Sequence, residues 1–242
     1  MVETMNTLTF KMGLKNGLPI ALGYLSVSFA FGVKASLLGI PVWFSALISM
    51  TNLTSAGQLA GITVIAALGT ISEMLLTQLV INSRYFLMGI SLSQKYDESF
   101  TTGKRLFLSA FITDEIFAVA ISERGNINAR YFLGLALLPY IGWAAGTIFG
   151  AIAGNILPQS VQSALGIALY AMFIAIIVPP ATKKISVLFV VMLAAAISCA
   201  FFYIPFLRET ISAGFGVVIC AVIAALVAAW LFPIKEKETE NA

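Results

Sequence analysis

Residues 106–122 read LFLSAFITDEIFAVAIS, a run long enough to cross most of a bilayer that holds two acids, Asp114 and Glu115, at its midpoint. The apolar run before it, about residues 70–92, carries Arg84 close to its middle. A charge at the bilayer centre costs at least about 2.5–3.5 kcal/mol on insertion scales, so such a residue by default faces the interior of a helix bundle and has a function there. One basic and two acidic side chains at similar depth therefore indicate a transport or proton pathway.

The composition is that of a membrane protein. Of the 242 residues, 60% are hydrophobic and only 10% are charged, and the mean hydropathy is +0.97. A soluble domain usually has about a quarter of its residues charged. We therefore predict an all-α polytopic membrane protein in which residues 1–242 form a single integral membrane domain.

Several function classes are disfavoured by what the chain lacks. It has no His, the commonest metal ligand and proton relay, and Cys199 and Cys220 lie in apolar runs as small hydrophobes, so we expect no metal and no cofactor. The net charge of +3 comes from cations scattered at the ends of apolar runs and does not indicate nucleic-acid binding. We find no hydrolase, protease or phosphate-binding motif, so we do not expect an enzyme, and transport would draw on an ion gradient.

Turn-forming or charged residues divide the chain into eight apolar runs. At about 20 residues per crossing they predict seven or eight transmembrane helices. If part of residues 42–92 re-enters without crossing, the number is seven and the C-terminus moves outside. Residues 234–242 are charged and predicted to be disordered, and the first sixteen residues lack the pattern of a cleaved signal peptide. The runs are about 17–38, 42–68, 70–92, 106–122, 131–154, 162–178, 185–205 and 211–232.

The distribution of Lys and Arg favours a cytoplasmic N-terminus. With eight crossings, eight cations lie near cytoplasmic run ends and five near outer ends, and cytoplasmic loops carry the excess of Lys and Arg. The eight are Lys11, Lys15, Arg124, Arg130, Lys183, Lys184, Lys235 and Lys237, and the five are Lys34, Lys95, Lys104, Arg105 and Arg208.

A faint internal repeat occurs at an offset of 118 residues. Phe31-Gly32 matches Phe149-Gly150, and residues 45–47 match residues 163–165. Many transporters are built from two repeated halves with the substrate site between them. An even number of crossings per half would make the halves parallel and an odd number would invert them, while a chance match is equally open.

The second run contains an unusually polar segment, SMTNLTSAGQ, at residues 49–58. Ser, Thr and Asn side chains compete for backbone hydrogen bonds and Gly tolerates unwound dihedrals, which favours a discontinuous helix. A helix broken inside a membrane exposes a half-helix N-terminus for a substrate carboxylate, with Ser55, Gly57 and Gln58 as candidate binding residues. The alternative is a continuous helix whose polar side chains bond to neighbouring helices.

Polar residues occupy two faces of the third run, so we expect protein or water on both. Arg84 either pairs with an acid of the fourth run, receives a substrate carboxylate near Asn82, or snorkels to the interface. At about 100° per residue, one stripe is Glu73, Thr77, Arg84 and Ser91, and the other is Gln78, Asn82 and Tyr85.

Asp114 and Glu115 are neighbours, so on a helix their side chains diverge by about 100° and are not expected to enter one small site. One acid would pair with Arg84, while the other titrates as the coupling residue or meets a substrate amine. The alternative is an ion pair that only fixes helix register.

Four glycines recur every four residues in the fifth run, which predicts a face that another helix approaches closely. They are Gly142, Gly146, Gly150 and Gly154.

These residues together resemble the AzlC family over about residues 13–120. In the second half the likeness is mainly Ala171-Met172-Phe173, and residues 165–168 lack the Asp that many members carry a few residues before this triplet. The matching motifs are Gly17-Leu18-Pro19 with Gly23 and Phe31-Gly32, Ser49 followed by Ala56-Gly57-Gln58, Asn82-Ser83-Arg84, and Thr113-Asp114-Glu115.

The resemblance implies a permease of the cytoplasmic membrane that exports branched-chain or similar hydrophobic amino acids, driven by protons, with a small membrane partner of the AzlD type. The zwitterion would bind at mid-membrane, its carboxylate at Arg84 or the amides of residues 55–58, its ammonium at Asp114 or Glu115. Its aliphatic side chain would meet aromatics such as Phe31, Tyr85 or Phe117. The alternative is a non-transporting assembly or regulatory subunit whose charges only fix helix register.

Overall fold

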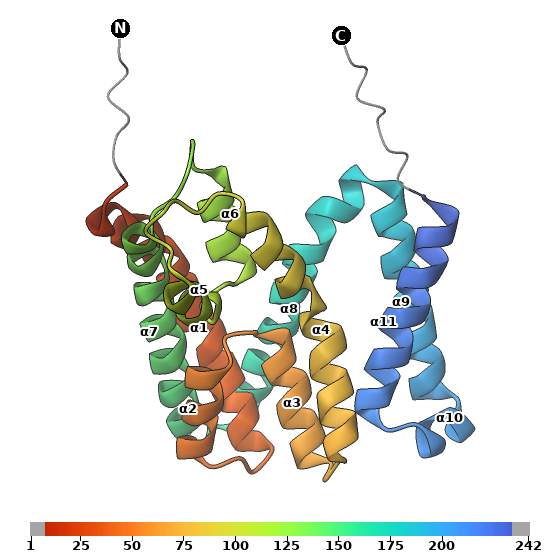
Figure 1. Ribbon diagram of the computed structural model, residues 1–242. Coiled ribbons are helices and arrows are strands. Elements are labelled where there is room, and N and C mark those ends of the chain that lie inside the picture. The colour runs from red at the N-terminus through yellow and green to blue at the C-terminus, as the bar shows by residue number, and fades with distance from the viewer. Residues whose placement is uncertain (1–7, 234–242) are drawn as a thin grey trace, which may run out of the picture.

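The computed structural model describes residues 8–233, and the predicted tail at 234–242 lies outside the described residues. The described chain is a bundle of α-helices without a β-strand, which confirms the all-α membrane fold (Figure 1). The helices are α1 (Phe10–Leu37), α2 (Val42–Thr51), α3 (Ala56–Ala66), α4 (Ile71–Ser93), α5 (Thr102–Ser109), α6 (Asp114–Ser122), α7 (Ala129–Ala153), α8 (Gln159–Lys183), α9 (Ile185–Tyr203), α10 (Pro205–Thr210) and α11 (Ala213–Leu231).

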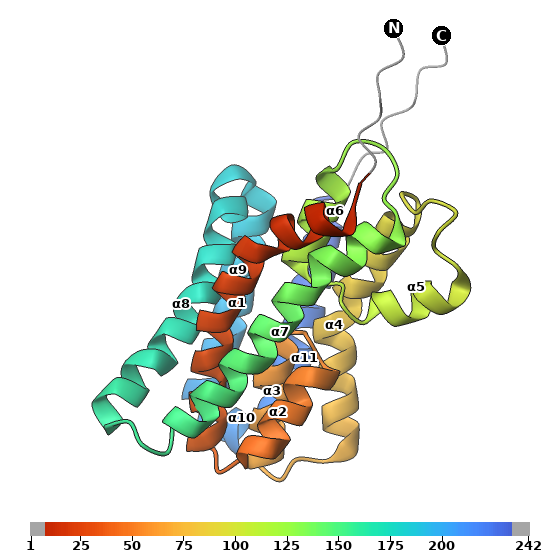
Figure 2. The ribbon, with the colours of Figure 1, turned by 90° about the vertical axis from the view of Figure 1, so that its left-hand side faces the viewer.

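The centre of the bundle is the contact between α1 and α7, which run parallel over their whole length (Figure 2). Glycines of both helices make this approach possible. A Cβ on Gly32 would overlap the Thr147 carbonyl, and a Cβ on Gly150 would overlap the Phe29 carbonyl. All four glycines of the predicted close-packing face lie against α1, so that prediction is confirmed and the face is occupied within the chain.

On each side of the α1–α7 pair, a helix from one half of the chain packs on the long helix of the other half, as two parallel halves would produce. α2, from the first half, packs on α7, and α8, from the second half, packs on α1 (Figure 2). Phe31-Gly32 and Phe149-Gly150, the matched dipeptides, both lie where α1 meets α7. The second half differs at one point, because α8 is one continuous helix where the first half has α2 and α3.

The α2–α3 segment enters the bundle and returns to the same side. Phe44, near the start of α2, and Ile65, near the end of α3, pack in one cluster with Ala35 at the end of α1. Figure 1 shows the chain rise through α2, turn, and descend through α3 before α4 begins. The expected helix break is therefore present at residues 52–55, and of the two predicted alternatives the re-entrant one holds.

The α5–α6 segment also enters the bundle and returns to the side from which it came, which is the side opposite to that of α2–α3. The prediction of one crossing helix at 106–122 is therefore wrong. Lys95, after α4, donates hydrogen bonds to the carbonyls of Ile121 (2.7 Å) and Glu123 at the end of α6. The Ser99 hydroxyl accepts from the Ala129 N–H at 2.8 Å. The chain thus enters and leaves at one level, because α5 and α6, at 8 and 9 residues, are each too short to span a bilayer.

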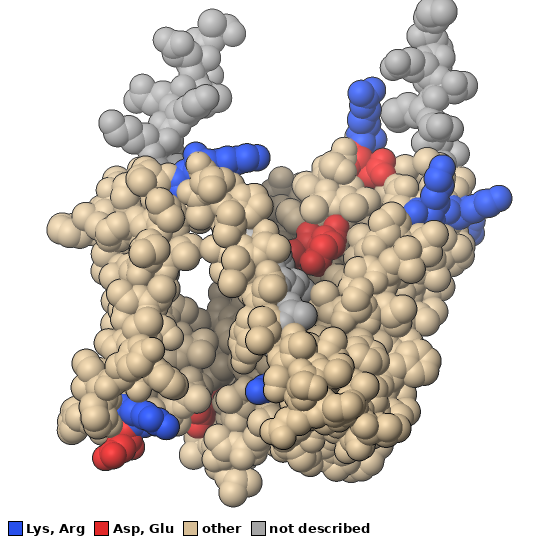
Figure 3. Space-filling model, turned by 180° about the vertical axis from the view of Figure 1, so that it is seen from behind, with Lys and Arg blue, Asp and Glu red and all other residues tan. Residues whose placement is uncertain are grey.

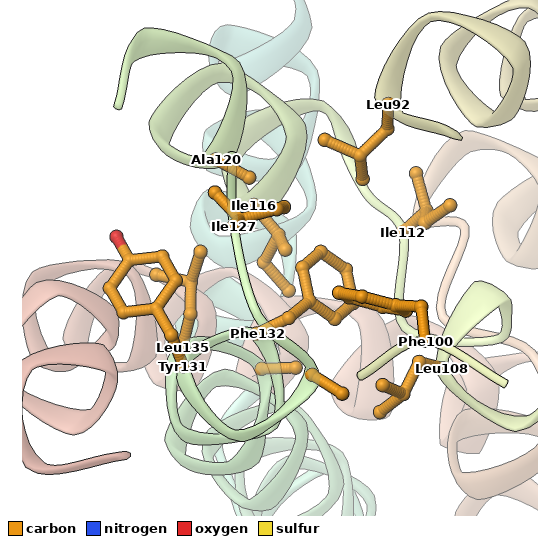
Figure 4. Close-up of a cluster of buried hydrophobic side chains, with 12 residues drawn as sticks. Leu92, Phe100, Leu108, Ile112, Ile116, Ala120, Ile127, Tyr131, Phe132 and Leu135 are labelled. Atoms are coloured by element: carbon orange, nitrogen blue, oxygen red, sulfur yellow. The ribbon is translucent and has the colours of Figure 1, made fainter. Parts of the chain in front are cut away.

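A cluster of buried apolar side chains holds this re-entrant segment in place (Figure 4). Ile112, in the break between α5 and α6, and Ile116, in the first turn of α6, pack with Phe100 from the preceding loop and Phe132 from α7. Each of these side chains is at most 6% exposed. Within a bilayer, van der Waals packing of this kind is a main source of helix association, so the cluster fixes the position of the break.

The helices that traverse the bundle are then α1, α4, α7, α8, α9 and α11, and both ends of the described chain lie on one side (Figure 1). Four of them, α1, α7, α9 and α11, meet a combined test of length and apolarity for a membrane span. α4 and α8 have 23 and 25 residues, also enough to cross. The predicted count of seven or eight crossings included the two runs that fold as re-entrant segments.

Re-entry also moves three cations, Lys95, Lys104 and Arg105, to the side on which the chain begins. Only Lys34 and Arg208 of the described cations then remain near the opposite end, whereas Arg84 lies inside. In Figure 3, most Lys and Arg of the visible face lie at the end of the molecule where the chain begins. The cations on the first side are Lys11, Lys15, Lys95, Lys104, Arg105, Arg124, Arg130, Lys183 and Lys184.

We predict that Gly150→Ala destabilises the protein by about 1–3 kcal/mol, because the added methyl group must force α1 and α7 apart. The measurement is thermal unfolding in detergent. Gly89→Ala is the matched control, since a Cβ on Gly89 meets nothing within 4 Å. Equal midpoints for the two variants would contradict the packing argument.

The re-entrant arrangement predicts that Glu98, between α4 and α5, and Arg124, between α6 and α7, are exposed on the same side. In a chain with Cys199 and Cys220 replaced by Ala, Glu98→Cys and Arg124→Cys should react with a membrane-impermeant thiol reagent from one side. Glu209→Cys, in α10, should react only from the other. Labelling of Glu98→Cys and Glu209→Cys from a common side would favour a crossing at 106–122 instead.

Candidate functional site

A cavity of about 630 Å³ lies inside the bundle between α1, α3, α4, α6, α7 and α8. Three charged residues line it: Arg84, Asp114 and Glu115. The remainder of the wall is mostly apolar. The other lining residues are Pro19, Ile20, Gly23, Tyr24, Val27, Leu53, Ser55, Ala56, Tyr85, Thr113, Trp143, Phe173, Ala175 and Ile177.

Arg84 and Asp114 form an ion pair on the cavity wall. Arg84 Nη1 lies 2.7 Å from Asp114 Oδ2, and the side chains are 38% and 32% exposed. Arg84 Nη2 also donates to the Tyr85 hydroxyl at 3.1 Å, while Nε is buried without a hydrogen-bond partner among the described residues. The pair predicted from the sequence is present, and it is open enough to the cavity for a ligand to reach both charges.

Glu115 has a different partner. The Tyr24 hydroxyl lies 2.5 Å from Glu115 Oε2 and 2.7 Å from Thr113 Oγ1. Since a phenol has one proton and a carboxylate is the stronger acceptor, Tyr24 donates to Glu115. Both acids therefore line one cavity, contrary to the expectation that their side chains diverge too far, because the cavity is wide enough to reach both of the first two residues of α6.

Two half-helices point their N-termini into this cavity. α3 begins after Ser55, whose φ of 41° and ψ of −80° place it in a sparsely populated backbone region, and Ser55 makes no side-chain cap. α6 begins after Thr113, whose hydroxyl accepts from the Ile116 N–H at 3.3 Å. A helix N-terminus carries roughly half a positive charge, so the start of α3 attracts an anion while that of α6 stabilises its own acids.

A buried polar network fixes the break before α3 from behind. Gln58, 1% exposed, donates to Ser49 Oγ at 3.1 Å and accepts from Trp143 Nε1 at 2.9 Å. Ser49 Oγ lies 2.7 Å from Thr147 Oγ1 on α7. These bonds join side chains of α2, α3 and α7 around the break and hold the three helices in place.

Gly57 and Asn82 belong to the same supporting shell. The Gly57 carbonyl accepts from Gln78 Nε2 at 2.8 Å, and Gln78 Oε1 accepts from Asn82 Nδ2 at 2.9 Å. A Cβ on Gly57 would come within 3.0 Å of Thr54, Gln78 and Asn82. Of the residues singled out in the sequence, the structure brings Arg84, Asp114, Glu115 and Ser55 to the cavity, whereas Gly57, Gln58 and Asn82 lie behind its wall.

Two of the three aromatics expected at an apolar substrate group lie elsewhere. Phe31 is 1% exposed between α1, α2 and α3, and Phe117 packs against the cluster of Figure 4, while Tyr85 does line the cavity. Sequence reasoning missed Tyr24 and Trp143, which meet edge-to-face at 5.0 Å between ring centroids on the cavity wall. Their signal was a polar-tipped aromatic in the middle of an otherwise apolar crossing helix.

Glu73 lies apart from the cavity, although it shares a predicted stripe with Arg84. Its carboxylate accepts from the Ser212 hydroxyl at 2.5 Å and from the Gly214 N–H at 2.8 Å, and it is 4% exposed. It therefore caps the N-terminus of α11, where a negative charge is favourable, and joins α11 to α4.

We predict that Gln58→Leu destabilises the protein by about 1–3 kcal/mol, because Trp143 Nε1 and Ser49 Oγ lose a buried partner. Thermal unfolding in detergent measures the loss, and the emission of Trp143 should shift as its indole N–H is freed. The control is Gln94→Leu, the same change at an exposed residue at the end of α4. Unchanged stability and emission in Gln58→Leu would show that the network does not hold the break.

Comparison with known proteins gives one family and several relatives. The family described as AzlC protein matches residues 19–157. The inner membrane protein YgaZ of Escherichia coli is 30% identical over 230 residues, covering 92% of this chain and 91% of the relative. An uncharacterized membrane protein of Archaeoglobus fulgidus is 33% identical, covering 70% of this chain and 75% of its own.

The branched-chain amino acid transport protein AzlC of Bacillus subtilis is 28% identical over 182 residues, covering 72% of this chain and 69% of the relative. No solved structure matches the chain. The matches include all residues that line the cavity from α1 to α7, since these lie within 19–157.

Proposed function

Because the chain belongs to the AzlC family, we propose that it is a secondary transporter that exports branched-chain or similar hydrophobic amino acids across the cytoplasmic membrane. The observation that carries this proposal is the ion pair of Arg84 and Asp114, half-exposed to a cavity between two half-helix N-termini. Charged side chains at mid-depth in a membrane protein mark, by default, a functional site.

The substrate carboxylate would bind between Arg84 and the start of α3. Arg84 offers a guanidinium that matches a carboxylate in two parallel hydrogen bonds. α3 adds the positive end of its dipole at Ser55 and Ala56, which line the same cavity. Gln58 and Asn82 contribute by fixing this end of α3 rather than by touching the substrate.

The substrate ammonium would bind at the acids of α6. Asp114 already pairs with a cation, Arg84, and Glu115 accepts a hydrogen bond from the Tyr24 hydroxyl. Both acids line the cavity. In the empty site Arg84 and Asp114 neutralise each other. A zwitterion inserted between them would give each charge a new partner, so binding does not leave a charge unpaired in a poorly solvated cavity.

Proton coupling is supported by the number of acids. Two carboxylates, Asp114 and Glu115, and one guanidinium, Arg84, are the charges of the cavity wall. When a substrate ammonium leaves, one acid lacks a cationic partner and protonation would relieve that cost. Asp114 and Glu115 are therefore the proposed coupling residues.

The fold supports a cytoplasmic N-terminus more strongly than the order of apolar runs in the sequence does, because it places more of the cations on one side. With the two re-entrant segments, nine described cations lie on the side where the chain begins and Lys34 and Arg208 lie on the other. The positive-inside rule assigns the cation-rich side to the cytoplasm.

The family resemblance also supports a small membrane subunit of the AzlD type as partner. The glycine face of α7 cannot receive it, because α1 lies there. α9 has no buried residue and presents apolar side chains along its length, so the C-terminal helices have surface free for a second membrane protein.

The test is efflux of leucine, isoleucine, valine and methionine from cells loaded with the corresponding dipeptides, with and without an AzlD-type subunit. Asp114→Asn and Glu115→Gln should each lower efflux at least about tenfold, because a charge-assisted hydrogen bond contributes about 1.5–3 kcal/mol. The amount of protein in the membrane should not change. Arg124→Gln, an exposed change outside the cavity, is the control.

The double variant Arg84→Met with Asp114→Asn separates transport from a purely structural pair. A structural pair tolerates joint removal better than either single change, whereas a transport site does not recover. Efflux restored in the double variant, or normal in both acid variants, would contradict the proposed mechanism and favour a non-transporting subunit.

A further inference from the structure

A second cavity, of about 320 Å³, lies between α3, α4, α8 and α11. It adjoins the first, because Ala56 and Phe173 line both. A cavity of this size lies at the lower end of the range of about 300–1,000 Å³ found for small-molecule sites. Only these two side chains are common to the walls, and one of them is as small as a methyl group.

The two cavities differ in chemistry. The first contains Arg84, Asp114 and Glu115, whereas none of the described residues that line the second is charged. Its polar groups are few, and the Thr63 hydroxyl already donates to the Leu59 carbonyl of its own helix at 2.8 Å. The wall is otherwise formed by Ala56, Leu59, Ala60, Val64, Ile81, Tyr170, Phe173, Ala213, Gly214 and Val217.

We infer that the second cavity receives the apolar side chain of the substrate while its ammonium and carboxylate remain in the first. The inference rests on the proposed function and adds the residues that select the side chain. A charged group would lose its partners on passing Ala56 and Phe173, but an aliphatic group would gain contact with apolar atoms there. The boundary between the cavities therefore divides the ligand into a charged head and an apolar tail.

Ala60 is the residue that decides how much room the tail has. It lies one helical turn beyond Ala56 on α3 and lines the second cavity only. A larger side chain at this position would fill space that a branched or longer substrate needs, without touching the charged groups. Ala60 is thus a specificity-determining residue and is not part of the head-group site.

The test is amino acid binding to the purified full-length protein in lipid nanodiscs, by calorimetry, for glycine, alanine, valine, leucine and methionine. Ala60→Phe should lower the affinity for leucine and methionine at least about tenfold while the affinity for alanine changes little. A single methylene in an apolar pocket changes discrimination by about 10–200-fold. Ala66→Phe is the control: the same change in the same helix, at a groove lined by Leu38 and Ile65 instead.

A selective loss for large side chains in Ala60→Phe and not in Ala66→Phe would support the inference. An equal loss of affinity for all five ligands, or an unchanged order of their affinities, would overturn the inference. Neither result would contradict the proposed amino acid site in the first cavity. A lipid found in the second cavity by native mass spectrometry, displaced by Ala60→Phe with the ranking unchanged, would assign the cavity to an acyl chain. If the wild-type protein binds none of the five, the proposed function fails and the inference with it.

Discussion

In a bilayer every backbone N–H and C=O must find a partner within the protein, and two segments of this chain interrupt their helices at mid-depth. Beside the break at residues 52–55, the Met50 carbonyl accepts from the Tyr140 hydroxyl and the Gly57 carbonyl accepts from Gln78 Nε2. Hydrogen bonds among the side chains of Gln58, Ser49, Thr147 and Trp143 join the helices that border or cross this break. The break before α6 is closed by Thr113 and by apolar packing around Ile116. The cavity exists because these partners allow the helices to stop there.

The close packing of α1 on α7 provides the frame for both interruptions. Glycines at the contact bring the two backbones together, so α2 and α8 can each pack on the helix of the other half. α1 also places Tyr24, and α7 places Trp143, on the cavity wall. A change at the glycine contact would therefore alter the distance between Tyr24 and Trp143 on the cavity wall, although none of the glycines at this contact lines the cavity.

Much of the site was predictable because a charge inside a membrane is costly and hence informative. Arg84 and the adjacent acids stand out in apolar runs, and the polar segment at 49–58 by itself indicates a helix break. The roles of Gln58 and Asn82 were not predictable in the same way. A buried amide and a ligand-binding amide look alike in a sequence, and only the partners at 2.9–3.1 Å reveal that they support the wall.

The sequence by itself determined the membrane class, the all-α fold, the family and the three charged residues of the cavity, since these follow from hydropathy, composition and local motifs. Only the tertiary structure decided that 42–66 and 102–122 re-enter, that both acids face one cavity, and that a second apolar cavity adjoins it. The physical reason is that a run of apolar residues satisfies a bilayer equally well as one crossing helix or as two short ones. Whether a run crosses or re-enters depends on side chains distant in the sequence. Lys95, after α4, bonds to the end of α6, and Trp143, on α7, bonds to Gln58 of α3.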